Sequence, residues 1–298
     1  MSHANSVSLV KLRRVLGKVR RRLRARSERR TATQEAQLSS LNLIQHLLVG
    51  QSWATQPTRM QNPLTAEPRK YWSQTDEDGI LEKILHRIGY SQPGTFLEFG
   101  VGDGRENNTL LLLALGWRGG WVGGQELVFQ PKQTGRLRFI KDWITLDNIG
   151  AHANELMNHF GITQPDVVSL DLDGNDLHFT KYLLEIGLRP AVWISEYNAK
   201  FPYGVRWTVT YDSAHTWNAD DYWGASFSSF CDLFATHDYF PVACSVQGAN
   251  VFFIRGDLRD RFADIPKNPA EIYQPPLHYL VPRWGHRASP KTLQSLTD

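Results

Sequence analysis

The chain has 298 residues, enough for one large α/β domain with extensions, and its 41% apolar content is ordinary for a soluble globular protein. Its two cysteines, Cys231 and Cys244, form neither a disulfide framework nor a C-x-x-C zinc pattern, which favours a reducing, cytoplasmic compartment. No apolar run reaches the roughly 18 residues of a membrane-spanning helix, so an integral membrane protein is not expected.

The formal net charge of +3 hides an uneven distribution along the chain. Residues 1–30 hold 11 of the 33 Lys and Arg residues and one of the 30 acidic residues. The rest of the chain therefore carries 22 basic and 29 acidic side chains, a formal charge of −7. Because the basic character is local, it does not indicate that the main domain binds nucleic acid.

Residues 7–30 are predicted to form a basic amphipathic helix. Leu9, Leu12 and Leu16 recur at spacings of three and four residues, so they share one helical face, opposite a face of Lys and Arg. Such a helix binds an anionic membrane surface or an acidic partner, and it is also typical of a solvated tail. The Arg-rich, acid-poor composition resembles an organelle transit peptide as well. The expected location is cytoplasmic, with peripheral membrane contact through this helix as one alternative.

A polar stretch, residues 31–70, separates this helix from the main domain. It ends in QPTRMQNPLTAEP, which is typical of a linker, so the domain is expected to begin near Tyr71. Residues 71–90 follow as a predicted helix with Thr75 or Asp76 as its N-cap.

An apolar strand followed by a glycine turn is the strongest local signal. Thr95–Phe99 is rich in strand formers, and Gly100, Gly102 and Gly104 follow directly. Glycines at this spacing let the backbone turn sharply and lie close against a ligand, near helix N–H groups. A dinucleotide site would read G-x-G-x-x-G, but here the third glycine comes one residue early and an acid, Glu98, precedes the turn. The alternative is a tight turn without a ligand.

The rest of the chain alternates between predicted strands and helices. The predicted strands are 116–123, 138–145, 166–171, 191–196, 239–245 and 250–255, and the predicted helices are 106–115, 148–160, 176–187 and 219–237. Gln247-Gly248 predicts a hairpin turn between the last two strands. Strands that alternate with helices indicate an α/β fold with a mainly parallel sheet.

Polar side chains gather after the fourth and fifth of the predicted strands. Asp171, Asp173 and Asp176 follow the fourth strand, and Glu196 and Asn198 follow the fifth. The ligand crevice of an open α/β sheet lies at the carboxyl ends of its strands, so the three Asp residues are expected where the chemistry takes place. Asp171, Glu196 and Asn198 are expected to converge on one point there. A hard cation such as Mg²⁺ prefers an oxygen-only set of this kind. The alternative is that these groups cap helices or form hydrogen bonds with a ribose or a substrate.

A long aromatic loop, residues 199–223, follows the fifth strand. Six of its residues are Trp or Tyr, which disfavours disorder and indicates a functional lid. Aromatic faces stack well on sugar rings. His215 in this loop is a candidate base, and the alternative is an exposed histidine without a function.

Four motifs in order resemble the class I S-adenosylmethionine (SAM) methyltransferases, in particular the FkbM-type enzymes and the metal-dependent O-methyltransferases of sugars and natural products. They are S-Q-x-x-E-D-G-I at 73–80, E-F-G-V-G-D-G-R-E-N-N-T at 98–109, G-W-R-G at 116–119, and D-x-D-G-x-D at 171–176 with E-Y-N at 196–198. The resemblance covers residues 71–255 and implies a Rossmann-like, seven-stranded, mostly parallel sheet with helices on both faces and an antiparallel last strand. The Pro-rich residues 256–298 are expected to wrap the surface as a tail.

The resemblance also implies a SAM site and a Mg²⁺ site. The implied metal ligands are Asp171, Glu196 and Asn198, and the implied catalytic base is Asp173, with His215 as the second candidate. The cofactor-binding residues implied by position are Glu98, Gly100, Gly102, Asp103, Gly104, Asn108, Glu126, Asp147, Asn148 and Asp171.

The sequence departs from this family after the second strand. Relatives place an acid there that holds both ribose hydroxyls, but here Gly123 and Gly124 occupy the place and the first acid is Glu126. Either Glu126 reaches back, or the ribose is held otherwise, or the site is weakened. Asp147 and Asn148 stand where relatives bind adenine, and they also suit the N-cap of the next helix.

The implied function is methyl transfer from SAM to a hydroxyl of a sugar, a glycan or a related small molecule, with assistance from Mg²⁺. Two alternatives stay open. Asp171-Leu172-Asp173 also fits the D-x-D motif of a metal-dependent glycosyltransferase. Alternatively, the chain is a catalytically inactive subunit with a methyltransferase fold that binds a partner, as the glycine in place of the ribose acid would allow.

Overall fold

The computed structural model describes residues 41, 44, 57–132, 135–276 and 291. The chain divides into two units, Met1–Pro57 and Thr58–Asp298, and nearly all of the described residues belong to the second. The helix predicted at residues 7–30 lies outside the described residues. Of the helices that are described, none has the length and apolar character needed to cross a membrane.

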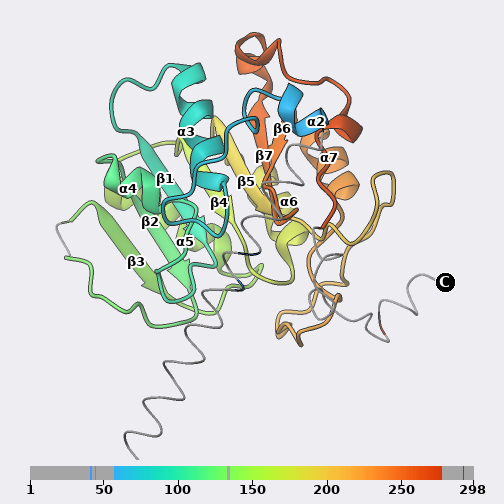
Figure 1. Ribbon diagram of the computed structural model, residues 1–298. Coiled ribbons are helices and arrows are strands. Elements are labelled where there is room, and N and C mark those ends of the chain that lie inside the picture. The colour runs from blue at the N-terminus through green and yellow to red at the C-terminus, as the bar shows by residue number, and fades with distance from the viewer. Residues whose placement is uncertain (1–40, 42–43, 45–56, 133–134, 277–290, 292–298) are drawn as a thin grey trace, which may run out of the picture. The chain divides into compact units, whose positions relative to one another are not determined.

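A seven-stranded sheet forms the centre of the second unit, in the order β3-β2-β1-β4-β5-β7-β6 (Figure 1). Strands β1 to β5 are parallel, whereas β7 runs antiparallel to both of its neighbours, β5 and β6. The predicted Rossmann-like fold, with a mostly parallel sheet and an antiparallel last strand, is therefore confirmed. The strands are β1 Thr95–Phe99, β2 Arg118–Gly123, β3 Leu137–Lys141, β4 Val167–Leu170, β5 Val192–Glu196, β6 Tyr239–Cys244 and β7 Asn250–Arg255.

Helices cover both faces of the sheet. The chain runs outward from β1 through β2 to β3, then returns to β4 and β5, and right-handed connections place the helices of these two halves on opposite faces. Helices α5 and α6 belong to the second half and pack against each other. The helices are α2 Pro57–Gln61, α3 Glu77–Ile88, α4 Leu110–Ala114, α5 Ile149–Phe160, α6 Asp176–Glu185 and α7 Phe227–Thr236, with the 3-10 helices η1 Gly256–Phe262 and η2 Pro269–Glu271.

The central strands are buried along their whole length. Every residue of β1 and of β4 is buried, because helices cover both faces of this part of the sheet. Strands buried on both faces read as continuous apolar runs, which is why these two were predictable. The sequence predicts strands at 95–99 and 166–171, close to the observed bounds.

Helix α4 is shorter than the predicted helix at 106–115, because it begins only at Leu110. The backbone N–H groups of Asn108 and Thr109 donate to the Glu98 carboxylate at 3.0 and 3.3 Å. The first predicted turn is therefore held as a loop against the end of β1.

Helix α7 begins at Phe227, although the sequence predicts a helix from residue 219. The Ser226 hydroxyl caps it by accepting a bond from the Ser229 N–H. The preceding residues form a loop because the Asn198 amide donates to backbone oxygens within it.

Strand β3 ends at Lys141, four residues before the predicted end at Thr145. Asn148 closes a turn here, since its Oδ1 accepts from the Thr145 N–H and its Nδ2 donates to the Trp143 carbonyl, both at 2.8 Å. Trp143 therefore leaves the sheet and lies at the carboxyl edge.

The outer edge of β6 is covered by two side chains from the stretch predicted as a linker. Asn62 Nδ2 donates to the Val242 carbonyl at 2.8 Å, and Arg59 Nη1 donates to the Cys244 carbonyl at 3.0 Å. Arg59 also forms an ion pair with buried Asp76 at 2.7 Å. Open carbonyls on an edge strand are a template for pairing with another chain, so this cover protects the sheet. The stretch is therefore part of the compact unit.

Candidate active site at the carboxyl edge of the sheet

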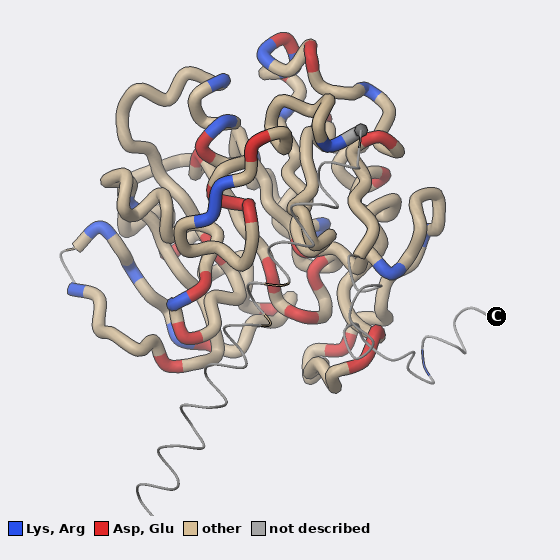
Figure 2. Tube along the Cα trace, in the orientation of Figure 1, with Lys and Arg blue, Asp and Glu red and all other residues tan. Residues whose placement is uncertain are grey.

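The parallel strands end along one edge of the sheet, and Figure 2 shows acidic segments (red) gathered on this lower side. Two glycines of the turn after β1 have different surroundings there. Gly100 has φ +95° and packs so closely that an added Cβ would lie 1.5 Å from the Asp171 backbone oxygen. Gly102 has φ +53°, and an added Cβ would meet no atom within 4 Å. Gly100 thus joins β1 to β4, whereas Gly102 faces open space.

Glu98 directs its carboxylate into the protein. It is 3% exposed and also accepts a hydrogen bond from the Thr109 hydroxyl. Burial raises the pKa of Glu98 to about 7, although its hydrogen bonds act in the opposite direction. The hydrogen-bond partners of Glu98 in this structure are therefore Asn108 and Thr109, which follow the glycine turn.

Two other predicted cofactor-binding residues of the turn differ in exposure. The Asn108 side-chain amide is buried and donates to the Ser169 hydroxyl of β4 at 3.1 Å. The Asp103 carboxylate lies at the surface and forms an ion pair with Arg105 at 2.5 Å. Asn108 thus links the glycine turn to β1 and β4. Asp103 and the open space at Gly102 lie on the side of the turn that faces solvent.

Three carboxyl groups meet beyond β4 and β5. Oxygens of Asp171, Asp173 and Glu196 all lie within 4.8 Å of one another. Burial raises the pKa of Asp171 well above its usual range, and the negative charges of Asp173 and its neighbours raise it further. The pKa of Glu196 is raised for the same two reasons. This acidic cluster thus disfavours ionisation of all three groups at once, and Asp171 and Glu196 share a hydrogen bond.

Asp176 shapes the turn that carries the acidic cluster. Its carboxylate accepts bonds from the Leu172 and Gly174 N–H groups at 2.8 and 2.9 Å. Burial raises its pKa to about 6. Within this turn Asp173 has φ +53°, a left-handed conformation in which Asp and Asn are enriched. The local geometry therefore presents Asp173 beside Asp171 at the strand end.

The acidic cluster fits a hard divalent cation. Carboxylate oxygens are the ligands that Mg²⁺ prefers, and a cation would relieve the repulsion that raises the pKa values of Asp171 and Glu196. In addition, Glu196 Oε2 is buried without a hydrogen-bond partner among the described residues. An oxygen in this condition usually has an ion, a water or a ligand nearby.

Asn198, the third predicted metal ligand, has other partners in this structure. Its Nδ2 donates to the Asp221 and Trp223 carbonyls at 3.0 and 3.1 Å, and its Oδ1 accepts from the Lys200 N–H at 3.2 Å. The amide thereby ties the aromatic loop to the end of β5. Its role as a metal ligand stays a prediction.

Gly123, the position at which the resemblance implies an acid, is packed closely. An added Cβ would lie 3.0 Å from Val101 Cγ2 and 3.3 Å from the Val101 nitrogen, tight against the glycine turn. Glu126 is 77% exposed and forms an ion pair with Lys141, and its role in holding the ribose stays a prediction. Glu126 also lines a separate pocket of about 280 Å³ beside β3, together with Phe129 and Phe139.

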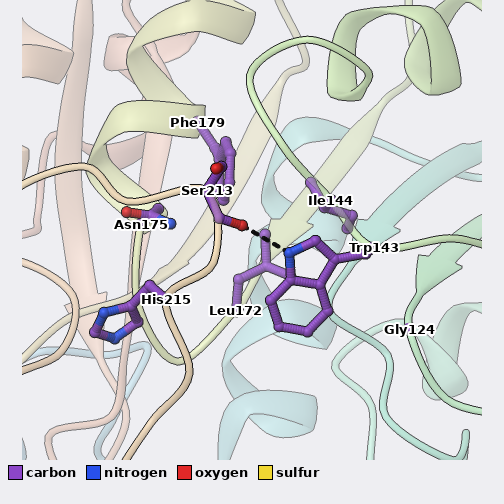
Figure 3. Close-up of a pocket in the computed structure, with 8 residues that line it drawn as sticks. All are labelled: Gly124, Trp143, Ile144, Leu172, Asn175, Phe179, Ser213 and His215. Atoms are coloured by element: carbon purple, nitrogen blue, oxygen red, sulfur yellow. Dashed lines mark hydrogen bonds between the residues drawn. The ribbon is translucent and has the colours of Figure 1, made fainter.

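A small pocket of about 80 Å³ lies beside the acidic cluster at the same edge. Figure 3 shows the indole of Trp143 on one side of it and His215 on the other. The pocket draws residues from the ends of β2, β3 and β4, from α6 and from the aromatic loop: Gly124, Trp143, Ile144, Leu172, Asn175, Phe179, Ser213 and His215.

Neither Asp147 nor Asn148 is among the described residues that line this pocket. Asn148 occupies the N-cap position of α5, and its side chain closes the turn after β3. Sequence reasoning missed Trp143, because it lies within the predicted strand at 138–145. The signal that could have found it is a tryptophan next to Asp142, a residue suited to ending a strand.

The aromatic loop is held by a small apolar core of its own. Phe201 and Trp207 stack with ring centroids 4.1 Å apart, and Tyr222 packs edge-on against Trp207 at 5.8 Å. Asn175 of the site fixes the loop at Asp212, donating from Nδ2 at 2.8 Å and accepting at Oδ1 at 3.2 Å. The prediction of an ordered loop over the site agrees with this arrangement.

The aromatic loop places His215 beside the turn between β4 and α6. His215 packs against Gly174, where an added Cβ would lie 2.4 Å from the ring, one residue away from Asp173. Its Nε2 is buried and has no hydrogen-bond partner among the described residues. The two candidate bases therefore lie on the same side of the site, and their catalytic roles stay predictions.

Comparison with known proteins gives likenesses to solved structures alone. Neither a protein-family model nor a curated protein matches the sequence. The 1,6-didemethyltoxoflavin-N1-methyltransferase of Burkholderia thailandensis, solved with S-adenosylhomocysteine, is 16% identical over 72% of this chain and 84% of its own, with a TM-score of 0.35.

Two further solved structures are similar to this chain. The MycE methyltransferase of mycinamycin biosynthesis, in complex with Mg and S-adenosylhomocysteine, is 13% identical over 73% of this chain and 51% of its own, with a TM-score of 0.32. A glycopeptide N-methyltransferase is 13% identical over 64% of this chain and 96% of its own, with a TM-score of 0.34.

Proposed function

We propose that this protein is a SAM-dependent methyltransferase that acts on a hydroxyl oxygen of a sugar, a glycan or a related small molecule. One observation carries the proposal. The open space at Gly102, the small pocket beside Gly124 and the acidic cluster all lie along one edge of one sheet. A flexible-backbone turn suits a bound nucleoside cofactor, and carboxyl groups next to it suit metal and proton chemistry.

The glycine turn and the pocket would hold the cofactor. The backbone at Gly102 has room for the amino-acid part of SAM, because nothing lies within 4 Å of the position of a Cβ. Ile144, Leu172 and Phe179 offer apolar walls for the adenine. When bound there, SAM would supply an electrophilic methyl group. The protein's contribution would be to align the acceptor oxygen with it and to exclude water.

Asp171, Asp173 and Glu196 would hold Mg²⁺. A cation at these carboxylates would orient an acceptor hydroxyl and lower its pKa. Asp173 is the exposed member of the cluster, so it is also the nearest carboxylate to an incoming hydroxyl, and His215 lies beside its turn. Either side chain would accept the hydroxyl proton as methyl transfer proceeds.

A sugar-like acceptor is supported by the aromatic loop. Tyr203 is exposed there, although an apolar core holds the loop. Exposed aromatic rings on an ordered loop are a stacking surface for sugar rings. Hydroxyl groups of the sugar could also bond with the loop's polar side chains.

Titration calorimetry with S-adenosylhomocysteine tests the cofactor assignment. Wild-type protein is expected to bind it, and Gly102→Arg is expected to abolish binding by filling the open space. Gly161→Arg is the matched control, because Gly161 at the end of α5 also has positive φ and no atom within 4 Å of an added Cβ. Both substitutions place a non-glycine residue in a left-handed backbone conformation, so they should destabilise the fold by similar amounts. Gly161 lies away from the site.

The same titration separates the rival functions. Equal binding by wild type and by the Gly102→Arg variant would contradict the assigned position of the cofactor. Metal-dependent binding of UDP-sugars without binding of S-adenosylhomocysteine would instead identify a glycosyltransferase that uses Asp171 and Asp173. Failure to bind either ligand would favour an inactive subunit.

A further inference from the structure

Trp143 forms an incomplete wall over the small pocket. Its indole is 51% exposed, yet it lines the pocket and lies against Gly124, where an added Cβ would be 3.4 Å from Cε3. A Cβ at this position would be in ordinary van der Waals contact with the indole, so the ring lies directly against the Gly124 backbone. The tryptophan therefore lines the pocket while half of its surface stays exposed, and Figure 3 shows its ring on one side of the pocket.

The indole is also tied to the aromatic loop. Its Nε1–H donates to the Ser213 carbonyl at 2.8 Å, across 70 residues of sequence, and Figure 3 shows this bond closing one side of the pocket. The Trp143 backbone is fixed separately, since its N–H donates to Asp142 and its carbonyl accepts from Asn148, both at 2.8 Å. Movement of the indole about its own side-chain bonds would thus break the Ser213 bond and leave the backbone in place.

The pocket is too small to admit a nucleoside in this arrangement. Its volume is about 80 Å³, whereas sites for small molecules are roughly 300–1,000 Å³. Most of its walls are fixed: Ile144, Leu172 and Phe179 belong to the packed ends of the sheet and α6, and Asn175 is bonded to Asp212. Gly124, Ser213 and Trp143 are the exposed lining residues, and Trp143 is the one among them with a bulky side chain.

We propose that Trp143 is a gating residue for the nucleoside part of the ligand. The indole leaves Ser213 to open the pocket, and it then packs on the flat base once the ligand is inside. Because the bond that breaks belongs to the aromatic loop, ligand binding loosens the loop segment around Ser213 and couples the two halves of the site. This inference rests on the proposed function, since it requires a ligand with a nucleoside.

Two substitutions separate the ring of Trp143 from its N–H group. Trp143→Phe keeps an aromatic ring and removes the donor to Ser213, so stopped-flow binding of S-adenosylhomocysteine should show association about 3- to 10-fold faster, the factor expected for one neutral hydrogen bond. Trp143→Ala removes the ring as well, and affinity should fall roughly 5- to 150-fold, the range for loss of one base-stacking side chain.

The loop provides a readout that is independent of affinity. Hydrogen exchange around residues 211–215 should be faster in ligand-free Trp143→Phe than in wild type, because the Ser213 bond is missing. Trp217→Phe is the matched control. Trp217 is an exposed tryptophan of the same loop whose Nε1–H donates to the Asp220 carbonyl at 2.8 Å, and it does not line the pocket. It should leave the association rate unchanged.

The outcomes distinguish this inference from the proposed function. If wild type binds S-adenosylhomocysteine but Trp143→Phe has the same association rate and the same loop exchange, the gate is refuted and the cofactor assignment stands. If Trp217→Phe accelerates association equally, the effect belongs to general loosening of the loop, and the gate is again refuted. If wild type does not bind at all, the proposed function fails and the gate fails with it.

Discussion

At the scale of the residue, the buried carboxyl group of Glu98 is held by several hydrogen bonds. Its two oxygens accept bonds from two backbone N–H groups and from the Thr109 hydroxyl, and that hydroxyl in turn accepts from the Trp121 indole at 2.8 Å. The hydroxyl hydrogen is therefore committed to Glu98. A carboxyl group satisfies this set even when it carries a proton, because Oε1 accepts only one of these bonds, whereas the N–H₂ of an amide in either position would meet another donor.

We therefore expect Glu98→Gln to lower the free energy of unfolding by about 1–3 kcal/mol, the cost of an unsatisfied buried donor. Urea denaturation measures this change. Glu126→Gln is the control, because Glu126 is 77% exposed and surface substitutions usually change stability by no more than about 0.5 kcal/mol. Equal effects of the two substitutions would show that the buried bonds of Glu98 do not matter.

The raised pKa of Glu98 gives this difference a pH dependence of definite sign. The folded-state pKa is about 7 and the ordinary value is 4.5, so between these values the folded protein retains a proton that the unfolded chain has lost. Stability from this group therefore falls as pH rises through that window. The stability advantage of wild type over Glu98→Gln should be largest near pH 4.5 and shrink toward pH 7, and an advantage that grows instead would contradict the assignment.

At the scale of the element, the turn between β4 and α6 combines strain with charge. Asp173 has φ +53°, so replacement by Ala would add strain to the loss of charge, whereas Asn tolerates this conformation. We expect Mg²⁺ to raise the melting temperature of wild type, and Asp173→Asn to remove most of that increase. Asp238→Asn is the matched control, because Asp238 also has positive φ, at 57°, and lies outside the acidic cluster.

Thermal unfolding with and without Mg²⁺ measures this effect, since a ligand that binds only the folded state stabilises it in proportion to occupancy. An equal Mg²⁺ response in wild type and in the Asp173→Asn variant would argue against a cation at this turn. Loss of the response in Asp238→Asn would point to a general effect of the substitution instead.

Elements were predictable where their own residues decide their structure. The apolar runs of β1 and β4 follow from strand burial, and the convergence of Asp171 and Glu196 follows from the shared edge of parallel strands. Helix ends were missed where a distant side chain decides them. Glu98 holds the stretch before α4, and Asn198 holds the loop before α7.

The pocket could not be predicted for a related reason. Trp143 and Ser213 meet only because a long loop folds back over the sheet edge, and no periodicity along the chain encodes that contact. Asn198 illustrates an ambiguity of another kind, since a polar residue at a strand end fits a metal site and a loop anchor equally well in sequence. The observed bonds place its amide in the loop.

At the scale of the whole molecule, the stretch after residue 57 completes the sheet. A chain truncated to begin at Tyr71, the predicted domain start, would lose Arg59 and Asn62, expose the β6 carbonyls and leave Asp76 buried without its ion pair. We expect this truncation to aggregate or to melt at a much lower temperature. A truncation that begins at Pro57 should stay monodisperse and melt near the full chain. Size-exclusion chromatography and thermal unfolding measure both, and equal behaviour would contradict a stabilising role for this stretch.

The separate core of the aromatic loop has an evolutionary consequence. Phe201, Trp207 and Val209 are buried and hold the loop in shape, while Tyr203 and Val205 between them face outward. The residues that fix the conformation of the aromatic loop are thus different from those that face outward. Outward positions can diversify under selection for new acceptors while the scaffold that performs the reaction is inherited unchanged, which makes this loop the natural place to randomise in a library for altered substrate preference.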